Sequence, residues 1–255
     1  MKNSNKLENK IITAAAVGRN VYIQLKTGKI TLKKATENTL YITTSDRNKK
    51  LIPNSKNNWM IWNIPAVITC PNATPHCIKY CYAKKAEVAY PSAKQKRLEN
   101  WKMSVDDNFV ARMIYTIYVN LYKAEKNGKK LNIRIHESGD FYSREYLEKW
   151  LDVAKEFENN NNVVFWCYTK SFSFFESEKE YQLLNIRASV WDDTKEKDID
   201  IINRYNVPVY TAYTADKIAD MKNNNIKFHL CRCADCSNCR ACSNGKIKLI
   251  VCEIH

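Results

Sequence analysis

The longest regular pattern of apolar residues lies between Asp106 and Lys126. Apolar side chains recur there three and four residues apart, at Phe109, Val110, Met113, Ile114, Ile117, Tyr118 and Leu121. This spacing places them on one face of an α-helix, with polar residues on the other face. Because Asn127-Gly128 interrupts the pattern, we predict a helix that ends there with one side buried.

Short apolar runs and helical patterns alternate through the rest of the chain. The first apolar run, Trp62–Ile68, precedes the helix described above. Further strands are predicted at residues 131–136, 163–168, 186–191 and 207–213. Between them the pattern predicts helices at residues 144–157, 178–184 and 195–205. Strands and helices that alternate in this way are typical of right-handed βαβ units around a parallel sheet.

The fold class is therefore α/β. Five strands occur in series, and the apolar run 247–252 adds a terminal strand. This number is too small for a closed eight-stranded barrel and predicts a partial (β/α) barrel of about five or six parallel strands. A doubly wound sheet is the alternative.

The first sixty residues show a different pattern. Alternating runs at residues 21–25, 30–32 and 39–44 surround Lys26-Thr27-Gly28-Lys29, which has the composition of a hairpin turn. We predict a small β meander, followed by a polar linker at residues 53–58. Three regions result: a basic, β-rich appendage with its linker at 1–58, the partial barrel at 59–225, and a cysteine-rich segment with the terminal strand at 226–255.

Positive charge is concentrated in the same N-terminal region. The net charge is +14, and residues 1–60 hold twelve Lys and Arg against three Asp and Glu. Such a block attracts phosphate groups and makes a nucleic acid a possible partner, although a solvated lysine-rich surface explains it equally well. The apolar runs are far shorter than the ~20 residues that cross a bilayer. We expect a soluble, cytoplasmic protein with no membrane partner.

Ten cysteines are many for this length, and eight of them fall into two tight groups. Cysteines so close together are poorly placed to bridge distant parts of a fold, and no apolar centre of a signal peptide is present. Metal ligation in a reducing compartment is therefore favoured over disulfides. Cys167 and Cys252 lie in apolar runs and are predicted to be core residues.

The first group is Cys70, Cys77 and Cys81, directly after the Trp62–Ile68 run. Three thiolates without a nearby fourth cysteine hold a metal centre and leave one coordination position free. If His76 completed the shell, zinc would be favoured instead. Loops at the carboxyl ends of parallel strands are where α/β folds place their chemistry.

This loop resembles that of the radical S-adenosylmethionine superfamily, in which three cysteines hold a [4Fe–4S] cluster that binds the cofactor. The likeness includes the position after the first strand and the aromatic Tyr80 before the last cysteine, while the spacing is C-x6-C-x3-C instead of C-x3-C-x2-C. The resemblance implies one such cluster at Cys70, Cys77 and Cys81, with S-adenosylmethionine beside Tyr80.

The chain also resembles the phage "gene eighty-eight" family, which is of unassigned activity. The likeness rests on Asn-Ile-Pro-Ala at 63–66, Thr-Cys-Pro at 69–71, Ala-Thr at 73–74 and Cys-Tyr-Ala at 81–83. It extends over residues 62–242, including 137–141 and the C-terminal cysteines. It implies a phage-encoded protein in a bacterial host cell and supplies no reaction.

A second informative stretch follows the predicted strand 131–136. It reads Glu137, Ser138, Gly139, Asp140 before a helix capped by Ser143. Glycine lets a backbone approach a ligand closely, and carboxylates bind ammonium or ribose hydroxyl groups. The stretch resembles the turn that receives the cofactor's amino group in radical enzymes, and an ordinary βα turn is the alternative. His136 could be a core histidine or a ligand, and we rank the core histidine first.

Polar and aromatic residues also follow the later strands and are candidates for a pocket at the same edge of the sheet. They are Tyr168, Thr169, Lys170, Trp191, Asp192, Thr211, Tyr213 and Thr214. We assign none of them a catalytic role.

The second cysteine group lies near the C-terminus. Cys233, Cys236, Cys239 and Cys242 follow one another at C-x2-C spacing, and Cys231 is an alternate to Cys233. This spacing is typical of ferredoxin-type cluster loops and predicts a second [4Fe–4S] cluster. A zinc knuckle is the competitor, although zinc sites usually separate two C-x2-C pairs by a longer loop.

These motifs together favour an iron–sulfur redox enzyme of radical S-adenosylmethionine type. Its partners would include an electron donor such as flavodoxin or ferredoxin, and its cofactors two [4Fe–4S] clusters and S-adenosylmethionine. The alternative is a nucleic-acid-binding or regulatory protein whose metals are purely structural.

Overall fold

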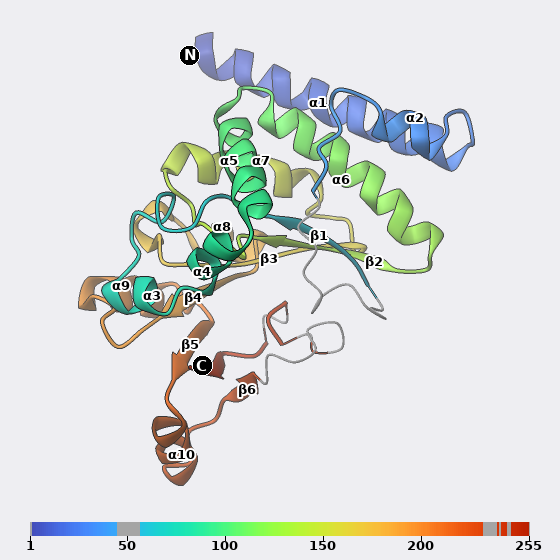
Figure 1. The fold of residues 1–255 in the computed structure, drawn as a ribbon. Coiled ribbons are helices and arrows are strands. Elements are labelled where there is room, and N and C mark those ends of the chain that lie inside the picture. The colour runs from blue at the N-terminus through green and yellow to red at the C-terminus, as the bar shows by residue number, and fades with distance from the viewer. Residues whose placement is uncertain (1, 45–56, 232–238, 240, 244–245, 255) are drawn as a thin grey trace.

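The computed structural model describes residues 2–44, 57–231, 239, 241–243 and 246–254 (Figure 1). Within these ranges the strands form a single parallel sheet that curls into an open half-barrel. The strand order is β1-β2-β3-β4-β5-β7-β6. The predicted partial (β/α) barrel is therefore confirmed, with seven strands in place of five or six.

β2 to β5 and β7 follow the predicted positions closely, whereas β1 is displaced and β6 was not predicted. The strand bounds are β1 Asn57–Trp62, β2 Lys130–Ile135, β3 Val163–Thr169, β4 Ile186–Val190, β5 Val209–Tyr213, β6 His229–Cys231 and β7 Leu249–Glu253. The chain order follows the sheet order up to β5, and β7 then enters between β5 and β6. All the paired strands run parallel, so the carboxyl ends of β1 to β5 share one edge.

The helices pack around this sheet. Their bounds are α1 Lys2–Lys26, α2 Leu32–Thr36, α3 Pro75–Lys79, α4 Tyr82–Ala89, α5 Pro91–Val105, α6 Phe109–Lys126, α7 Arg144–Glu156, α8 Glu178–Leu183, α9 Glu196–Arg204 and α10 Ala215–Asn223. The predicted helices correspond to α6, α7, α8 and α9. None of the helices in the described ranges is long and apolar enough to cross a membrane.

Aromatic residues fill the core between the sheet and its covering helices. Trp62, at the end of β1, packs edge-on against Phe109 of α6 and Trp150 of α7. Its indole N–H donates to the Tyr146 hydroxyl at 3.0 Å, which satisfies a polar atom inside the core. Burying side chains of this size contributes roughly 2–3 kcal/mol each. This packing holds the end of β1, and the loop that follows it, against α7.

The predicted N-terminal β meander is wrong. Residues 21–25 belong to α1 and residues 32–36 to α2. Ala14, Val21 and Leu25 form a buried stripe on α1, which runs alongside α6 (Figure 1). A Cβ on Gly18 would lie 2.6 Å from Tyr118, so the two helices approach closely there. Packing against α6 thus overrides the strand preference of the β-branched residues in this run.

The turn between the two N-terminal helices is also different from the predicted hairpin. Gly28 has a φ of +70° and follows the last turn of α1, where the Lys29 N–H bonds to the Gln24 carbonyl at 2.9 Å. Glycine in this conformation commonly ends a helix as well as closing a hairpin. The sequence alone does not separate these two uses.

The predicted division of the chain falls partly on residues that the structure does not describe. Of the predicted linker at 53–58, residues 53–56 lie outside the described ranges, and residues 57–58 belong to β1 instead. Residues of α1 and α2 contribute to the same buried cluster as the sheet. Leu230, Leu249 and Phe228 pack instead around a smaller cluster formed by Ile218, Met221 and Val251. The boundaries at 58 and 225 stay predictions.

The strand before the first cysteines is displaced from the predicted Trp62–Ile68. β1 ends at Trp62, because Asn63 and Pro65 leave the sheet and Val67 adopts a φ of +68°. Pro65 has no N–H for a strand ladder, and the Asn63 carbonyl accepts instead from the Asn100 side chain at 2.8 Å. The chain therefore turns earlier than its apolar character indicates.

Candidate functional site

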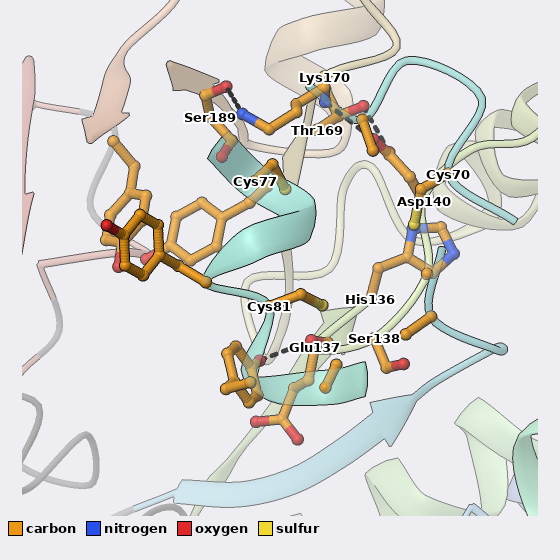
Figure 2. A pocket seen from close by; sticks show the side chains of 18 of the residues that line it. Cys70, Cys77, Cys81, His136, Glu137, Ser138, Asp140, Thr169, Lys170 and Ser189 are labelled. Carbon is orange, nitrogen blue, oxygen red and sulfur yellow. Dashed lines mark hydrogen bonds between the residues drawn. The ribbon is translucent and has the colours of Figure 1, made fainter. Parts of the chain in front are cut away.

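A cavity of about 210 Å³ opens at the carboxyl-terminal edge of the sheet (Figure 2). Its walls come from the loop after β1, from α3 and α4, and from the ends of β2, β3, β4 and β5. The lining residues include all three cysteines of the first group and all five residues proposed to bind the cofactor: Cys70, Cys77, Cys81, Tyr80, Glu137, Ser138, Gly139 and Asp140. Segments 60 residues apart in sequence therefore meet at this edge.

Local capping interactions hold the three cysteines. The Cys70 N–H closes a turn on the Val67 carbonyl at 3.0 Å. Cys77 lies in α3, whose first turn is capped by the Thr74 hydroxyl. Cys81 is itself the N-cap of α4, because its sulfur accepts the Lys84 N–H at 3.4 Å. Figure 2 shows their side chains pointing into the same cavity.

The electrostatic surroundings show that these thiols are close to one another. Burial raises the pKa of Cys70 well above its usual range, and charges on Asp140, Cys77 and Cys81 raise it further. Burial also raises the pKa of Cys77, which the Lys170 ammonium partly offsets. Thiols in such a place ionise readily only when a cation binds them. The group therefore suits a positively charged metal centre.

Within the part of the chain that the structure describes, no three His, Cys, Asp or Glu side chains are arranged to hold a single metal ion. A [4Fe–4S] cluster makes a different demand, because each cysteine binds a different iron and the sulfurs stand further apart than the ligands of one ion. Cys70, Cys77 and Cys81 all line the cavity.

The packing of the fold requires a glycine at position 139. Its φ is +82°, and a Cβ there would lie 2.3 Å from Ile64 Cγ1 and 2.7 Å from Thr69 Oγ1. Ile64 and Thr69 belong to the loop that carries Cys70. The glycine thus lets the turn after β2 pack closely against the cysteine loop. The Asp140 N–H donates to the Thr69 carbonyl at 3.2 Å and links the two segments.

Both carboxylates of the turn already have protein partners. The Glu137 carboxylate forms an ion pair of 2.7 Å with Arg134, and its carbonyl accepts from the Tyr82 hydroxyl at 2.5 Å. Asp140 accepts from the Thr169 hydroxyl at 2.6 Å and from the Lys170 N–H at 2.9 Å. Burial nevertheless raises the pKa of Asp140 to about 6. Asp140 therefore joins the ends of β2 and β3 at the cavity wall.

His136 is buried, as the sequence predicts for a core histidine, and it also reaches the cavity. Its Nε2 lies 2.9 Å from the Tyr146 hydroxyl, and its ring contacts Phe141 edge-on. Burial lowers its pKa to about 3, so the ring is neutral. Its Nδ1 has no hydrogen-bond partner among the described residues. A buried nitrogen of this kind at a cavity wall fits a ligand that supplies the missing partner.

The opposite wall is cationic and aromatic. Lys170 is buried, and its ammonium donates to the Ser189 carbonyl at 2.6 Å and lies 5.7 Å from the Trp191 ring. Burial lowers the pKa of Lys170 to about 8. The Trp191 and Tyr80 rings are parallel, with centroids 6.0 Å apart. Lys170 and Trp191 could be found from the sequence as residues that follow strand ends, although nothing in it assigned them a role.

Sequence reasoning gave Arg134 no role. It is the second-last residue of β2, and its guanidinium carbon is 4.8 Å from the Trp166 ring and 5.7 Å from the Tyr168 ring. Together with the ion pair to Glu137, these contacts place a cation deep in the cavity wall. The sequence gives no distinct signal for it, because polar and apolar residues alternate along β2 and Arg134 falls at a polar position of this alternation.

The second cysteine group is only partly described. Cys233 and Cys236 lie outside the described residues. Cys231 ends β6, Cys239 is exposed, and Cys242 accepts a hydrogen bond from the Tyr168 hydroxyl at 2.6 Å. Because Tyr168 also lines the cavity, Cys242 lies next to its wall. Cys167 and Cys252 are buried, which confirms that they are core residues.

Comparison with known proteins supports one of the two resemblances. The family model described as "Gene product 88" matches residues 31–245. The chain is 33% identical over 106 residues to the Gene 88 protein of Mycobacterium phage D29, which covers 40% of this chain and 42% of that protein. For the Gene 88 protein of Mycobacterium phage L5 the values are 32%, 40% and 43%. The chain thus matches less than half the length of these relatives. No solved structure matches it.

Proposed function

We propose that this chain, which belongs to the Gene product 88 family, is an iron–sulfur redox enzyme of radical S-adenosylmethionine type. The observation that supports this proposal is the cavity that unites the cysteine loop with the turn after β2. Since the matched relatives are phage proteins, it would act in the cytoplasm of a bacterial host with a flavodoxin or ferredoxin as electron donor.

The residues that line the cavity have different roles in this proposal. Cys70, Cys77 and Cys81 would hold the cluster, whose chemistry would be the one-electron reductive cleavage of S-adenosylmethionine into methionine and a carbon radical. Glu137 and Asp140 lie beside the cysteines on the turn after β2 and orient the cofactor. Because each is already bound to a neighbour, it is held rigidly before a ligand arrives. Tyr80 supplies an aromatic face.

Lys170 balances the negative charge of this site. It lies near Cys77 and Asp140, whose charges oppose the lowering of its pKa by burial. A cation in this position stabilises thiolates and any anionic group of a bound ligand. The Trp191 ring beside it excludes water from one side of the cavity. Exclusion of water protects a reactive carbon radical from side reactions.

Anaerobic purification, followed by iron, sulfide and zinc analysis and electron paramagnetic resonance, tests the proposal. We expect the reduced protein to show a cluster signal that S-adenosylmethionine perturbs, and prolonged reduction to release 5′-deoxyadenosine. Cys77→Ala should lose the iron of one cluster and all nucleoside product, whereas Cys252→Ala, which changes a core cysteine, should keep both. Zinc without acid-labile sulfide in the wild-type protein would contradict the proposal.

The nucleic-acid alternative has one supporting observation. Lys26, Lys29, Lys33 and Lys34 are exposed where α1 meets α2, so the basic block remains on the surface. Replacing Lys29, Lys33 and Lys34 by Glu should lower affinity for a mixed-sequence oligonucleotide and flatten its dependence on salt. If oligonucleotide binding responds to these changes and the chain cleaves no cofactor, the nucleic-acid-binding function is favoured over the redox enzyme.

A further inference from the structure

His136, the first residue after β2, has a backbone conformation that side chains rarely adopt. Its φ is +61°, in the left-handed region where glycine or asparagine is the usual residue. The turn is held in this shape by Asn63, whose side-chain oxygen accepts from the Glu137 and Ser138 N–H groups at 2.7 and 3.1 Å. A histidine in a strained conformation at a cavity wall points to a use for its ring.

The hydrogen bond to Tyr146 decides which ring nitrogen of His136 carries the proton. Within the described residues the Tyr146 hydroxyl has two partners, the Trp62 indole N–H at 3.0 Å and His136 Nε2 at 2.9 Å. An indole N–H can only donate, so the hydroxyl oxygen accepts from Trp62 and its hydrogen has Nε2 as acceptor. Because burial lowers the pKa of His136 to about 3, the ring is neutral and its one proton lies on Nδ1.

The Nδ1–H group is a donor that no described residue satisfies. His136 is only 4% exposed, so bulk water does not replace the missing partner. The two nitrogens of an imidazole face in different directions, and Nδ1 therefore points away from Tyr146. Figure 2 shows the ring among the side chains that surround the cavity. A ligand that offers an acceptor there removes the cost of an unpaired buried donor.

The chemistry of that acceptor can be narrowed. The two carboxylates of the same turn, on Glu137 and Asp140, already bind Arg134 and Thr169, so the acceptor has to come from the ligand. A carboxylate oxygen forms the strongest bond with an N–H group, because the bond is charge-assisted. S-adenosylmethionine carries one carboxylate, at its amino-acid end.

We propose that the Nδ1–H group of His136 donates a hydrogen bond to the carboxylate of S-adenosylmethionine bound in this cavity. This inference rests on the redox function proposed above and adds a contact that the cysteines and the carboxylates of the turn do not supply. The contact makes the site discriminate against analogues of the cofactor that lack a carboxylate, since they leave the buried donor unpaired.

Proton–nitrogen NMR correlation spectra of the metal-free protein test the position of the proton. The chain has four histidines, so each ring can be assigned from a single histidine-to-glutamine variant. We expect Nδ1 of His136 to be protonated and Nε2 to be unprotonated throughout the neutral pH range. A protonated Nε2, or exchange between the two tautomers, would overturn the proposal.

Calorimetric titration of the anaerobically purified protein with S-adenosylmethionine tests the contact itself. His136→Gln has no donor at the Nδ1 position, so the dissociation constant should rise about tenfold or more. His136→Asn places an amide N–H near that position and tolerates a positive φ, so it should recover most of the affinity. The matched control is His229→Gln, on β6 and outside the cavity lining, which should bind as the wild type does.

Decarboxylated S-adenosylmethionine separates the carboxylate from the rest of the ligand. Its affinity should be equal in the wild type and in His136→Gln, and circular dichroism shows whether each variant folds. An equal loss for both ligands would mean that the substitution disturbs the whole cavity, and no loss for either would mean that Nδ1 meets only an internal water. Both results overturn the proposal. Absence of sulfide and nucleoside product in a protein that still binds S-adenosylmethionine through His136 would contradict the redox function alone.

Discussion

The two cysteine groups are held in place by different parts of the fold. Cys70, Cys77 and Cys81 lie in turns and caps between β1 and α4, at an edge where four strands of the sheet end. Cys231 and Cys242 lie on a short outer strand and on a turn tied down by one arginine. Backbone turns and helix caps hold the first group. The described part of the second group depends instead on the hydrogen bonds that Arg187 donates to the Ala241 and Cys242 carbonyls.

This contrast predicts that the two metal centres differ in how much their removal lowers the stability of the protein. A cluster at the first group adds chemistry to a framework that is already packed, so its removal should leave the core intact. A metal at the second group, which the cysteine spacing predicts, should contribute directly to the folding of the C-terminal segment. Four substitutions test the comparison, in order of decreasing effect.

Arg187→Ala should have the largest effect. It leaves three buried carbonyls without donors and opens a cavity, so the free energy of unfolding should fall by about 4–5 kcal/mol. Urea denaturation measures this loss. Arg187→Lys, which keeps the charge and one donor, should recover part of the stability. A variant as stable as the wild type would mean that this turn does not depend on the arginine.

Gly139→Ala should cost about 3–4 kcal/mol, because it combines left-handed backbone strain with the contact against Ile64. The matched control is Gly28→Ala, whose φ is +70° but whose Cβ would meet nothing within 4 Å. That change should cost about 1 kcal/mol, the strain alone. Thermal unfolding compares them. Equal losses would show that the turn after β2 yields without disturbing the cysteine loop.

Asp140 should make the stability of the metal-free protein depend on pH. Burial raises its pKa to about 6, above its usual value, so the folded state keeps a proton that the unfolded state has released. Its contribution is therefore complete below pH ~4 and is lost as the pH rises from ~4 to ~6, by about 2–3 kcal/mol. The difference in unfolding free energy between wild type and Asp140→Asn, measured over this range, should follow that slope. A constant difference would contradict it.

Cys81 should show the smallest effect on stability. Its sulfur caps α4, so Cys81→Ala should cost about 0.5–1 kcal/mol in the metal-free protein, whereas Cys81→Ser should keep the cap. Both variants should lose cluster iron, measured together with sulfide. A loss of several kcal/mol in Cys81→Ala would mean that the first group is structural, which would remove its contrast with the second.

The alternation of strands and helices from residue 106 to 213 could be predicted from sequence because each element there has one clear periodicity. The helix at Phe109–Lys126 and the strands β2 to β5 follow from apolar spacing of 3.6 or 2 residues, and Ser143 caps α7 as its position indicates. The meeting of Cys70 with the turn at Glu137–Asp140 also follows, because parallel strands bring their carboxyl ends to one edge.

Only the tertiary structure decided the remaining features. The run Val21–Leu25 becomes a helix because α6 offers a long apolar face, and no local pattern reveals that partner. Side chains at least 10 residues away determine the surroundings of Arg134, Lys170 and His229. These neighbours are Trp166, Cys77 and Cys239, respectively. Periodicity along a chain records which side of an element is buried, whereas the identity of its neighbours depends on how the whole sheet curls.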